Sequence, residues 1–429
     1  MTIKEKAAQM KADSSKMANK SARIRDLALQ NVADYLLQNK EMILEANKKD
    51  LQNAEKANLD QPIIKRLKFD EQKLKDVTQG ITELIALPDP LFRIKMQREL
   101  DDGLVLFRET CAIGVIGIIF ESRPDAMVQI AALCIKSGNC AILKGGSEAL
   151  FTNRALFQVI SKAALDAGLP EGCLFQAEGR DEISELLSCH ESVDLLIPRG
   201  SNAFVQYIMN NTKIPVMGHA DGICHVYVDA DADINKAIRV IIDSKTQYVS
   251  VCNATETLLV HKDVAAGLLP KLKKAFDEKH VEVRGTKDVC KIISCNQATE
   301  EDFKTEYLDY IISVKIVDSL QEAIEHINNY GSHHTDSIIT ENKKTAEEFM
   351  RYVDSAGVYC NCSTRFADGY RYGFGAEVGV STGKLHARGP VGLEGLVTYK
   401  YKLFGNGHIV DDYATGKKQF HFKDVKCDE

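Results

Sequence analysis

The first ninety residues follow a helical pattern of hydrophobic and polar positions. Apolar side chains recur three or four residues apart over residues 24–36 and again over residues 77–84. The intervening positions are rich in Ala, Lys, Glu and Leu. The pattern predicts helices over about residues 4–86. The segment Pro88-Asp89-Pro90 predicts their end, because a residue that precedes proline avoids the helical conformation.

Two later segments alternate apolar and polar residues, as strands with one solvated face do. In residues 93–109 the alternation is interrupted by Asp101-Asp102-Gly103, which predicts a hairpin turn. Residues 398–408 predict an edge strand far in sequence from its neighbours. Because an exposed strand edge is a template for pairing with another chain, these arms favour a homodimer or larger homo-oligomer.

From residue 114 onward, short apolar runs alternate with helical segments. Strands buried on both faces are expected at 114–120, 140–143, 173–176 and 193–197, with helices at 124–138, 147–167 and near 181–187. This alternation predicts an α/β fold with a doubly wound parallel sheet. A second α/β series begins near Val226, with helices expected at 234–243, 264–278, 320–328 and 345–353.

Composition narrows the class of protein. The 429 residues are 45% hydrophobic and 27% charged, with a formal net charge of −7, as expected for a globular chain of roughly two or three domains. Without a basic block, an apolar membrane span or a secretory signal, we expect no nucleic acid, no membrane and a cytoplasmic location. The twelve cysteines are then expected to be reduced thiols, and their irregular spacing argues against structural zinc.

Cys252 is the strongest candidate for chemistry. It lies in the polar segment Val249-Ser250-Val251-Cys252-Asn253-Ala254, directly before an apolar run of β-prone residues. A thiol in such a segment is placed to act as a nucleophile, and the N–H groups around Asn253 and its side-chain amide are candidates for stabilising an oxyanion. The alternative is that Cys252, like most of the twelve, is a packing residue.

Three turns could receive anions. Residues 144–147 (KGGS) and 198–201 (PRGS) each follow a predicted strand and open a helix, where free N–H groups attract phosphate. Neither is a standard nucleotide fingerprint, and both are equally consistent with ordinary turns. In the third turn, Ser122 supplies a hydroxyl donor and Arg123 an anion clamp, although a surface salt bridge is equally compatible with Arg123.

Two further segments carry candidate substrate ligands. His219, in the segment that joins the two α/β series, is suited to contact a substrate or leaving group, or to be a structural histidine. Residues 384–390 (KLHARGP) place Lys384, His386 and Arg388 within five positions, which would bind a carboxylate or phosphate near the thiol or do nothing specific on a solvated face.

Taken together, these segments resemble the gamma-glutamyl phosphate reductases (glutamate-5-semialdehyde dehydrogenases) of the aldehyde dehydrogenase superfamily. The matching motifs run in order over nearly the whole chain: residues 117–124 (GIIFESRP), 136–139 (KSGN), 145–148 (GGSE), 197–200 (IPRG), 222–229 (GICHVYVD), 252–254 (CNA), 363–369 (STRFADG) and 384–393 (KLHARGPVGL). The chain departs from the family's usual residues at Asp125, Ser201, Tyr248-Val249 and His333, none of which is a reacting group.

The resemblance implies a reaction. The Cys252 thiolate would attack L-glutamyl 5-phosphate and expel phosphate, and NADPH would reduce the thioester to glutamate 5-semialdehyde, the second step of proline biosynthesis from glutamate. It implies catalytic roles for Cys252, Asn253 and Ser122, and no metal. At position 219 hydrolytic relatives carry a glutamate that activates water. His219 therefore implies an enzyme that exchanges acyl groups with phosphate.

The resemblance also implies the ligand contacts. Lys144 and Ser147 would hold the adenosine ribose and its 2′-phosphate, Gly200 and Ser201 the pyrophosphate, and Glu306 the nicotinamide ribose. Candidates for substrate binding are His219 and the four cations Arg123, Arg365, Lys384 and Arg388. The sequence does not decide which of the four would bind the substrate carboxylate and which the phosphate.

The implied organisation is aldehyde dehydrogenase-like. An NADPH-binding, Rossmann-like domain would span residues 1–92 and 112–225, a catalytic domain residues 226–395, and oligomerisation arms residues 93–111 and 396–429. A transient contact with glutamate 5-kinase would protect the labile acyl phosphate. Two rivals stay open: a hydrolytic aldehyde dehydrogenase, and a nucleotide-sensing binding protein in which Cys252 is a redox thiol.

Overall fold

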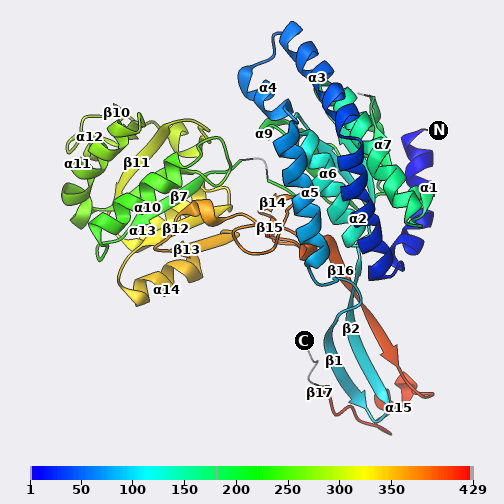
Figure 1. Ribbon diagram of the computed structural model, residues 1–429. Coiled ribbons are helices and arrows are strands. Elements are labelled where there is room, and N and C mark those ends of the chain that lie inside the picture. Colours follow the sequence, from blue (N-terminus) through cyan, green and yellow to red (C-terminus); the bar gives the residue numbers. More distant parts are fainter. Residues whose placement is uncertain (1, 180, 220, 426–429) are drawn as a thin grey trace. The chain divides into compact units, whose positions relative to one another are not determined.

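The computed structural model describes residues 2–179, 181–219 and 221–425. Two compact units divide the chain (Figure 1). Unit 1 comprises Met1–Met217, Gly375–Val378 and Val391–Glu429, and unit 2 comprises Gly218–Phe374 and Gly379–Pro390.

Unit 1 begins with the predicted helical region. Its helices are α1 (Ile3–Ala18), α2 (Ala22–Gln38), α3 (Lys40–Lys56), α4 (Gln61–Leu67) and α5 (Glu71–Ala86). The Thr2 hydroxyl accepts the Glu5 N–H and the Glu5 carboxylate accepts the Thr2 N–H, so a capping box begins α1. The prediction of helices up to residue 86 is confirmed, and α5 ends just before Pro88.

The sheet of unit 1 has four parallel strands in the order β5-β4-β3-β6. They are β3 (Val115–Phe120), β4 (Cys140–Gly145), β5 (Leu174–Ala177) and β6 (Leu195–Arg199), connected by α6 (Pro124–Lys136), η1 (Ser147–Ala149), α7 (Leu150–Asp166), η2 (Glu171–Cys173) and α8 (Asp181–Leu187) and followed by α9 (Asn202–Asn210). The chain adds strands on one side of β3 and then returns to its other side. The topological switch point therefore lies between β3 and β6, as in other doubly wound sheets.

A long antiparallel sheet forms the second part of unit 1, in the order β16-β2-β1-β17 (Figure 1). Its elements are β1 (Ile94–Asp101), β2 (Leu104–Ala112), β16 (Val397–Phe404) and β17 (Lys423–Val425), with η5 (Leu393–Leu396) and α15 (Val410–Ala414) beside them in sequence. The predicted hairpin is confirmed, with Gly103 at φ +75° in its turn. The predicted edge strand is confirmed as β16, which pairs with β2 over eight residues.

Unit 2 is built on seven parallel strands in the order β10-β9-β11-β8-β7-β12-β13. They are β7 (Cys224–Val228), β8 (Thr255–His261), β9 (Glu282–Gly285), β10 (Asn296–Gln297), β11 (Ile311–Val317), β12 (Thr335–Ile339) and β13 (Gly357–Cys360). The remaining elements are α10 (Ile234–Thr246), α11 (Lys262–Glu278), α12 (Lys287–Cys290), η3 (Glu301–Lys304), α13 (Leu320–Tyr330), α14 (Lys343–Tyr352), η4 (Thr364–Phe366) and the short strands β14 (Gly379–Ser381) and β15 (Gly389–Val391).

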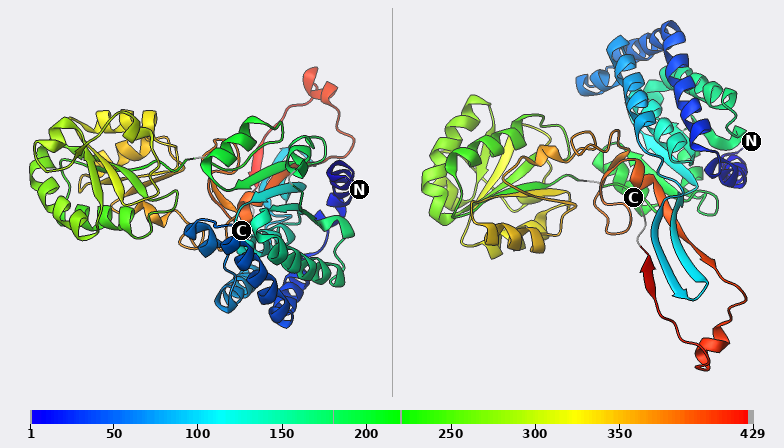
Figure 2. Two further views of the ribbon diagram at one scale, coloured as in Figure 1. Left: turned by 90° about the horizontal axis from the view of Figure 1, so that it is seen from above. Right: turned by 60° about the horizontal axis from the view of Figure 1, so that its bottom comes forward.

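Helices cover both faces of this sheet (Figure 2). Val226 and Leu258 pack with the side chains of α10 and α11 on one face. Tyr227 and Leu259 pack with α13 and α14 on the other. Successive side chains of a strand point to opposite faces, so the continuous apolar runs of β7 and β8 fill two cores at once.

None of the helices in the described part of the chain combines the length and the apolar character needed to cross a membrane.

Candidate active site

The candidate nucleophile lies at the amino-terminal edge of the unit 2 sheet. Cys252 comes three residues before β8 and His334 directly before β12, while β7 runs between these two strands. Because parallel strands begin at the same edge, residues 82 positions apart in sequence meet there. Ligands of an open α/β sheet usually bind at the opposite, carboxyl edge. The position of Cys252 at the amino-terminal edge therefore could not be predicted from the pattern of strands in the sequence.

The backbone around Cys252 is held closely by neighbouring segments. The Ala254 N–H donates to the Val251 carbonyl at 3.0 Å, which closes a turn with Cys252 at its centre. The Cys224 thiol donates to the Cys252 carbonyl at 3.2 Å. Gly222 lies against this turn so tightly that a Cβ atom on it would be 2.1 Å from the Cys252 carbonyl oxygen. The backbone of this half-buried cysteine is therefore fixed in place.

Asn253 fastens the turn to the segment around η4. Its Nδ2 donates to the Ala367 carbonyl at 2.8 Å, and the Thr364 hydroxyl donates to the Asn253 carbonyl at 2.7 Å. The buried Oδ1 of Asn253 has no hydrogen-bond partner among the described residues. The predicted oxyanion donor thus has one of its two amide protons engaged in positioning the turn.

Arg365 is the candidate cation that unit 2 places beside the thiol. Its side chain is buried, and its Nε donates to the Gln247 side-chain oxygen at 2.9 Å. Burial lowers the pKa of Arg365 and Arg371 acts in the same direction, whereas the nearby Cys252 opposes them. An arginine keeps its charge in proteins, so a positive guanidinium stays close to the sulfur.

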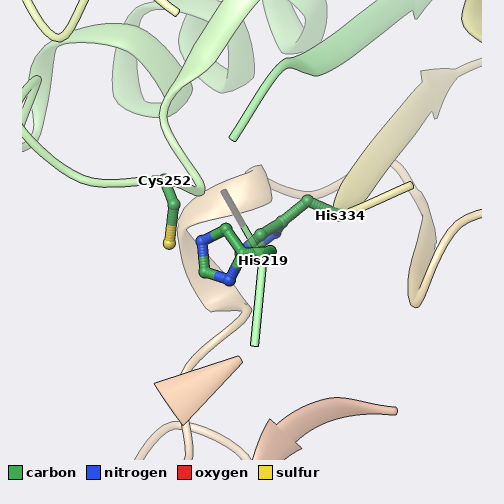
Figure 3. A group of neighbouring side chains, drawn as sticks. All are labelled: His219, Cys252 and His334. Atoms are coloured by element: carbon green, nitrogen blue, oxygen red, sulfur yellow. The ribbon is translucent and has the colours of Figure 1, made fainter. Parts of the chain in front are cut away.

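Two histidines complete the surroundings of Cys252 (Figure 3). The Nδ1 of His219 lies 2.8 Å from the Val380 carbonyl, and the His219 ring packs edge-on against that of His334 with centroids 4.8 Å apart. His334 is fully buried. One ring nitrogen of each histidine and the Cys252 sulfur all lie within 4.8 Å of one another.

Lys384 and Arg388 are both engaged by one carboxylate. Lys384 Nζ lies 2.6 Å from Asp354 Oδ2, and Arg388 Nη2 lies 3.1 Å from Asp354 Oδ1. Hydrogen bonding to Lys384 lowers the pKa of Asp354, although burial partly opposes it, and Arg388 lowers it further. The two charges are thus partly neutralised within the protein, and an anionic ligand would have to compete with Asp354 for them.

A buried ion pair supports the segment that carries Cys252. Lys245, near the end of α10, lies 2.5 Å from Glu256 at the start of β8, and both side chains are fully buried. Burial raises the pKa of Glu256 and lowers that of Lys245. Glu306, the candidate for the nicotinamide ribose, is half-buried and close enough to influence both groups electrostatically.

Unit 1 holds a separate pocket of about 220 Å³ at the carboxyl edge of its sheet. Its lining residues end or follow β3 and β4, or belong to α8 and α9: Ile119, Phe120, Glu121, Lys144, Gly145, Gly146, Ser147, Glu148, Ile183 and Phe204. Lys144 is buried and its Nζ donates to the Gly145 carbonyl at 2.7 Å, whereas Ser147 is exposed. The pocket therefore combines two of the predicted cofactor residues.

Two carboxylates accept hydrogen bonds from Ser201 and Ser122, two further candidates of unit 1. Glu121 accepts the Ser201 N–H at 3.0 Å, at the N-terminus of α9 and beside the exposed Gly200. Glu148 accepts both the N–H and the hydroxyl of Ser122, at 2.6 and 2.9 Å. Ser122 therefore uses its hydroxyl within unit 1, where φ is +48°.

Arg123, the remaining candidate, is half-buried at the N-cap of α6. It has no ion-pair partner within residues 2–179, 181–219 and 221–425.

Sequence reasoning missed four residues that shape these sites: Gly222, His334, Glu121 and Glu148. Glu121 is a charged residue directly after an apolar strand and next to Ser122 and Arg123, which is a local signal for a site residue. His334 directly precedes a β-prone run, as Cys252 does. The contact of Gly222 with Cys252 left no local signal, because it depends on the pairing of β7 with β8.

Comparison with known proteins identifies the class. The family model described as the aldehyde dehydrogenase family matches residues 2–302. The chain therefore belongs to the aldehyde dehydrogenase family, whose members are oxidoreductases that use nicotinamide cofactors.

Closer relatives define the group within that family. The chain is 58% identical to the gamma-glutamyl phosphate reductase of Acetivibrio thermocellus over 98% of its own length and 97% of the relative's. It is 55% identical to the enzyme of the same name from Pelotomaculum thermopropionicum, over 100% of its own length and 99% of the relative's. The crystal structure of gamma-glutamyl phosphate reductase from Thermotoga maritima superposes with a TM-score of 0.93 at 39% identity. The superposition covers 94% of this chain and 99% of the Thermotoga maritima chain. Within the aldehyde dehydrogenases, this chain groups with the gamma-glutamyl phosphate reductases.

Proposed function

We propose that the protein reduces L-glutamyl 5-phosphate to L-glutamate 5-semialdehyde and phosphate, the second step of proline biosynthesis from glutamate, with NADPH as the reductant. The observation that carries the proposal is Cys252, a half-buried thiol in a turn that Gly222, Cys224, Thr364 and Ala367 hold in place. Its surroundings offer a cation and imidazole nitrogens, as a site for an anionic acyl donor needs.

The proposed reaction begins at the Cys252 sulfur. The thiolate attacks the acyl carbon, a thioester forms, and the carbon–oxygen bond to phosphate breaks so that phosphate leaves with the bonding electrons. Asn253 positions the turn and is the proposed donor to the developing oxyanion through its second amide proton or its N–H. Bound NADPH would supply the hydride that converts the thioester to the semialdehyde.

Arg365 is the cation in unit 2 best suited to hold a substrate carboxylate or phosphate. It is buried close to Cys252, and its Nε donates to the neutral side chain of Gln247. Lys384 and Arg388 instead share Asp354 and would bind an anion only after leaving it. Arg123 in unit 1 stays a proposed ligand, and the catalytic role of Ser122 stays a prediction.

His219 supports a phosphate-dependent reaction. A carbonyl oxygen can only accept a hydrogen bond, so Nδ1 of His219 carries a proton toward Val380 and Nε2 is the nitrogen with the lone pair in the neutral ring. We place this nitrogen against the substrate beside Cys252. No glutamate stands at position 219 to activate water, so the thioester is expected to persist until it is reduced or returned to phosphate.

We assign the adenosine and phosphate part of NADPH to the pocket of unit 1. Lys144 and Ser147 would hold the ribose and its 2′-phosphate, and Gly200 and Ser201 the pyrophosphate. The Ser201 N–H donates to an anionic oxygen, that of Glu121, which supports the proposal that this helix N-terminus binds a negative group. Glu306 of unit 2 is the proposed contact of the nicotinamide ribose.

The test of the proposal is the phosphate requirement of the reverse reaction. Oxidation of glutamate 5-semialdehyde with NADP⁺ is measured with and without inorganic phosphate. We expect reduction of NADP⁺ to depend on phosphate in the wild type and to be lost in Cys252→Ala. Oxidation at the same rate without phosphate would establish a hydrolytic aldehyde dehydrogenase instead. NADPH binding without any turnover would indicate a nucleotide-sensing protein.

The assembly is proposed from the antiparallel sheet. β16 forms its edge within the described residues, and Tyr399, Tyr401 and Leu403 lie exposed on one face of this strand. We propose that this edge pairs with a second copy of the chain in a homodimer or larger assembly. The contact with glutamate 5-kinase, the cytoplasmic location and the domain boundaries stay predictions.

A further inference from the structure

Cys252, His219 and His334 form a cluster that the proposed reaction does not fully use. Each offers one donor atom, and the three donors lie within 4.8 Å of one another (Figure 3). They come from three separate segments of unit 2, which precede β7, β8 and β12. A thiolate and two imidazoles at such separations are a ligand set for a thiophilic metal ion.

His334 supplies the independent observation for a ligand. It is fully buried, and its Nε2 has no hydrogen-bond partner among the described residues. A buried polar nitrogen left without a partner is destabilising, so such an atom calls for an explanation. A metal ion that accepts the Nε2 lone pair satisfies this nitrogen.

The outer contacts of both histidines have the pattern found in metal sites. His219 directs Nδ1 to the Val380 carbonyl at 2.8 Å, and His334 directs Nδ1 to the Thr335 hydroxyl at 2.9 Å. A histidine that binds a metal through one nitrogen almost always donates the other N–H to an oxygen, which fixes its tautomer. The Val380 carbonyl selects Nε2 as the ligating atom of His219, and the Thr335 hydroxyl can accept the Nδ1 proton of His334 and leave its Nε2 for the metal.

The geometry favours zinc. Tetrahedral Zn²⁺ bound at about 2.0–2.3 Å brings its ligand atoms to about 3.4–3.7 Å from one another. The three donors therefore need to approach by about 1 Å, which a change in the side-chain torsion of half-buried Cys252 can contribute. Two imidazoles and one thiolate leave the fourth position to water, as in zinc sites with three protein ligands.

We propose that Cys252, His219 and His334 bind Zn²⁺ reversibly, and that the bound ion inhibits the enzyme by occupying the thiolate. This metal is an inhibitor and takes no part in the reaction. Binding itself goes beyond the proposed function, whereas the inhibition rests on it, because it requires Cys252 to be the nucleophile.

Cobalt is the spectroscopic probe for this site. Co²⁺ is added to the full-length protein, and the near-ultraviolet thiolate-to-cobalt absorption is recorded, followed by displacement with Zn²⁺. We expect one such site in the wild type, none in Cys252→Ser, and at least about 100-fold weaker binding in His334→Asn, since loss of even an outer partner costs 10–100-fold.

His333→Asn is the matched control for His334→Asn. It removes an imidazole from the adjacent position, where φ is +60° and asparagine is well tolerated. This variant should bind Co²⁺ and Zn²⁺ within about twofold of the wild type. If His334→Asn fails to fold, His219→Gln tests the same ligand set.

The outcomes separate this inference from the proposed function. The same absorption in Cys252→Ser would overturn the site and point to another thiol, such as the Cys290–Cys295 pair, whose sulfurs are 3.3 Å apart. Equal affinity in His334→Asn and His333→Asn would also overturn it. Metal bound at Cys252 without inhibition of NADP⁺ reduction would leave the site standing and refute Cys252 as the nucleophile.

Discussion

Replacement of Gly222 by alanine tests whether the position of the Cys252 backbone controls activity. A Cβ at residue 222 would lie 2.1 Å from the Cys252 carbonyl oxygen, 2.4 Å from its Cα and 2.6 Å from its carbonyl carbon. Ordinary van der Waals contact begins near 3.4 Å, so the two segments must separate by about 1 Å or more. All three atoms are backbone, so no side-chain rotation relieves the clash.

The expected effect on activity is large. A misplacement of about 1 Å at a reacting group costs roughly 100-fold in rate, which is about 2.7 kcal/mol of activation free energy. Extra volume forced into a packed site costs typically 1–3 kcal/mol of stability. We therefore expect Gly222→Ala to lower kcat for phosphate-dependent NADP⁺ reduction about 100-fold, at a temperature at which urea titration shows the variant still folded.

Gly267→Ala is the matched control. Gly267 lies inside α11, and a Cβ there meets nothing within 4 Å. Alanine in a helix interior is favoured over glycine by about 0.4–1 kcal/mol, so this variant should be slightly more stable and fully active. Activity of Gly222→Ala within about twofold of the wild type would refute the reasoning, because Cys252 would then tolerate the displacement.

The remaining predictions concern the buried pair, the arm and the cofactor. Lys245→Met should destabilise the protein by about 3–5 kcal/mol, whereas Lys236→Met at a surface pair should leave the stability nearly unchanged. A group whose pKa is raised in the folded state contributes stability at low pH, and this contribution is lost as the pH rises through the folded-state pKa. Burial raises the pKa of Glu256 to about 7. Urea titrations of Lys245→Met should therefore show a larger loss of unfolding free energy near pH 8 than near pH 6. Tyr401→Lys, on the exposed face of β16, should raise the dimer dissociation constant at least about tenfold by light scattering, and an unchanged mass distribution would refute pairing through this face. Ser147→Glu should lower the preference for NADPH over NADH at least about tenfold in kcat/KM, and an unchanged ratio would remove Ser147 from the 2′-phosphate site.

Elements of the fold could be predicted wherever a run of side chains is buried in a regular pattern. The continuous apolar runs predicted β3, β4 and β6, and the helical spacing predicted α2 and α5, because burial dictates those residues directly. β17 was missed. It is only three residues long, all exposed, and its pairing with β1 brings together residues more than 300 positions apart.

The candidate site was predictable one segment at a time. Cys252 was found from its polar turn before a strand, which is a local feature. Its neighbour His334 was not, because their proximity depends on the strand order β8-β7-β12. The same limit applies to Lys384 and Arg388: three basic side chains in one loop suggest an anion site, but only the structure shows that Asp354 engages two of them.

The central claim, a thioacyl intermediate on Cys252, is tested most directly by intact-protein mass spectrometry. The full-length enzyme is mixed with glutamate 5-semialdehyde and NADP⁺ without phosphate, and the product is digested to locate any modification. We predict one γ-glutamyl adduct on the peptide containing Cys252, which disappears when phosphate is added and does not form in Cys252→Ala. NADPH formation with no adduct on Cys252, or an adduct on another cysteine, would contradict the account.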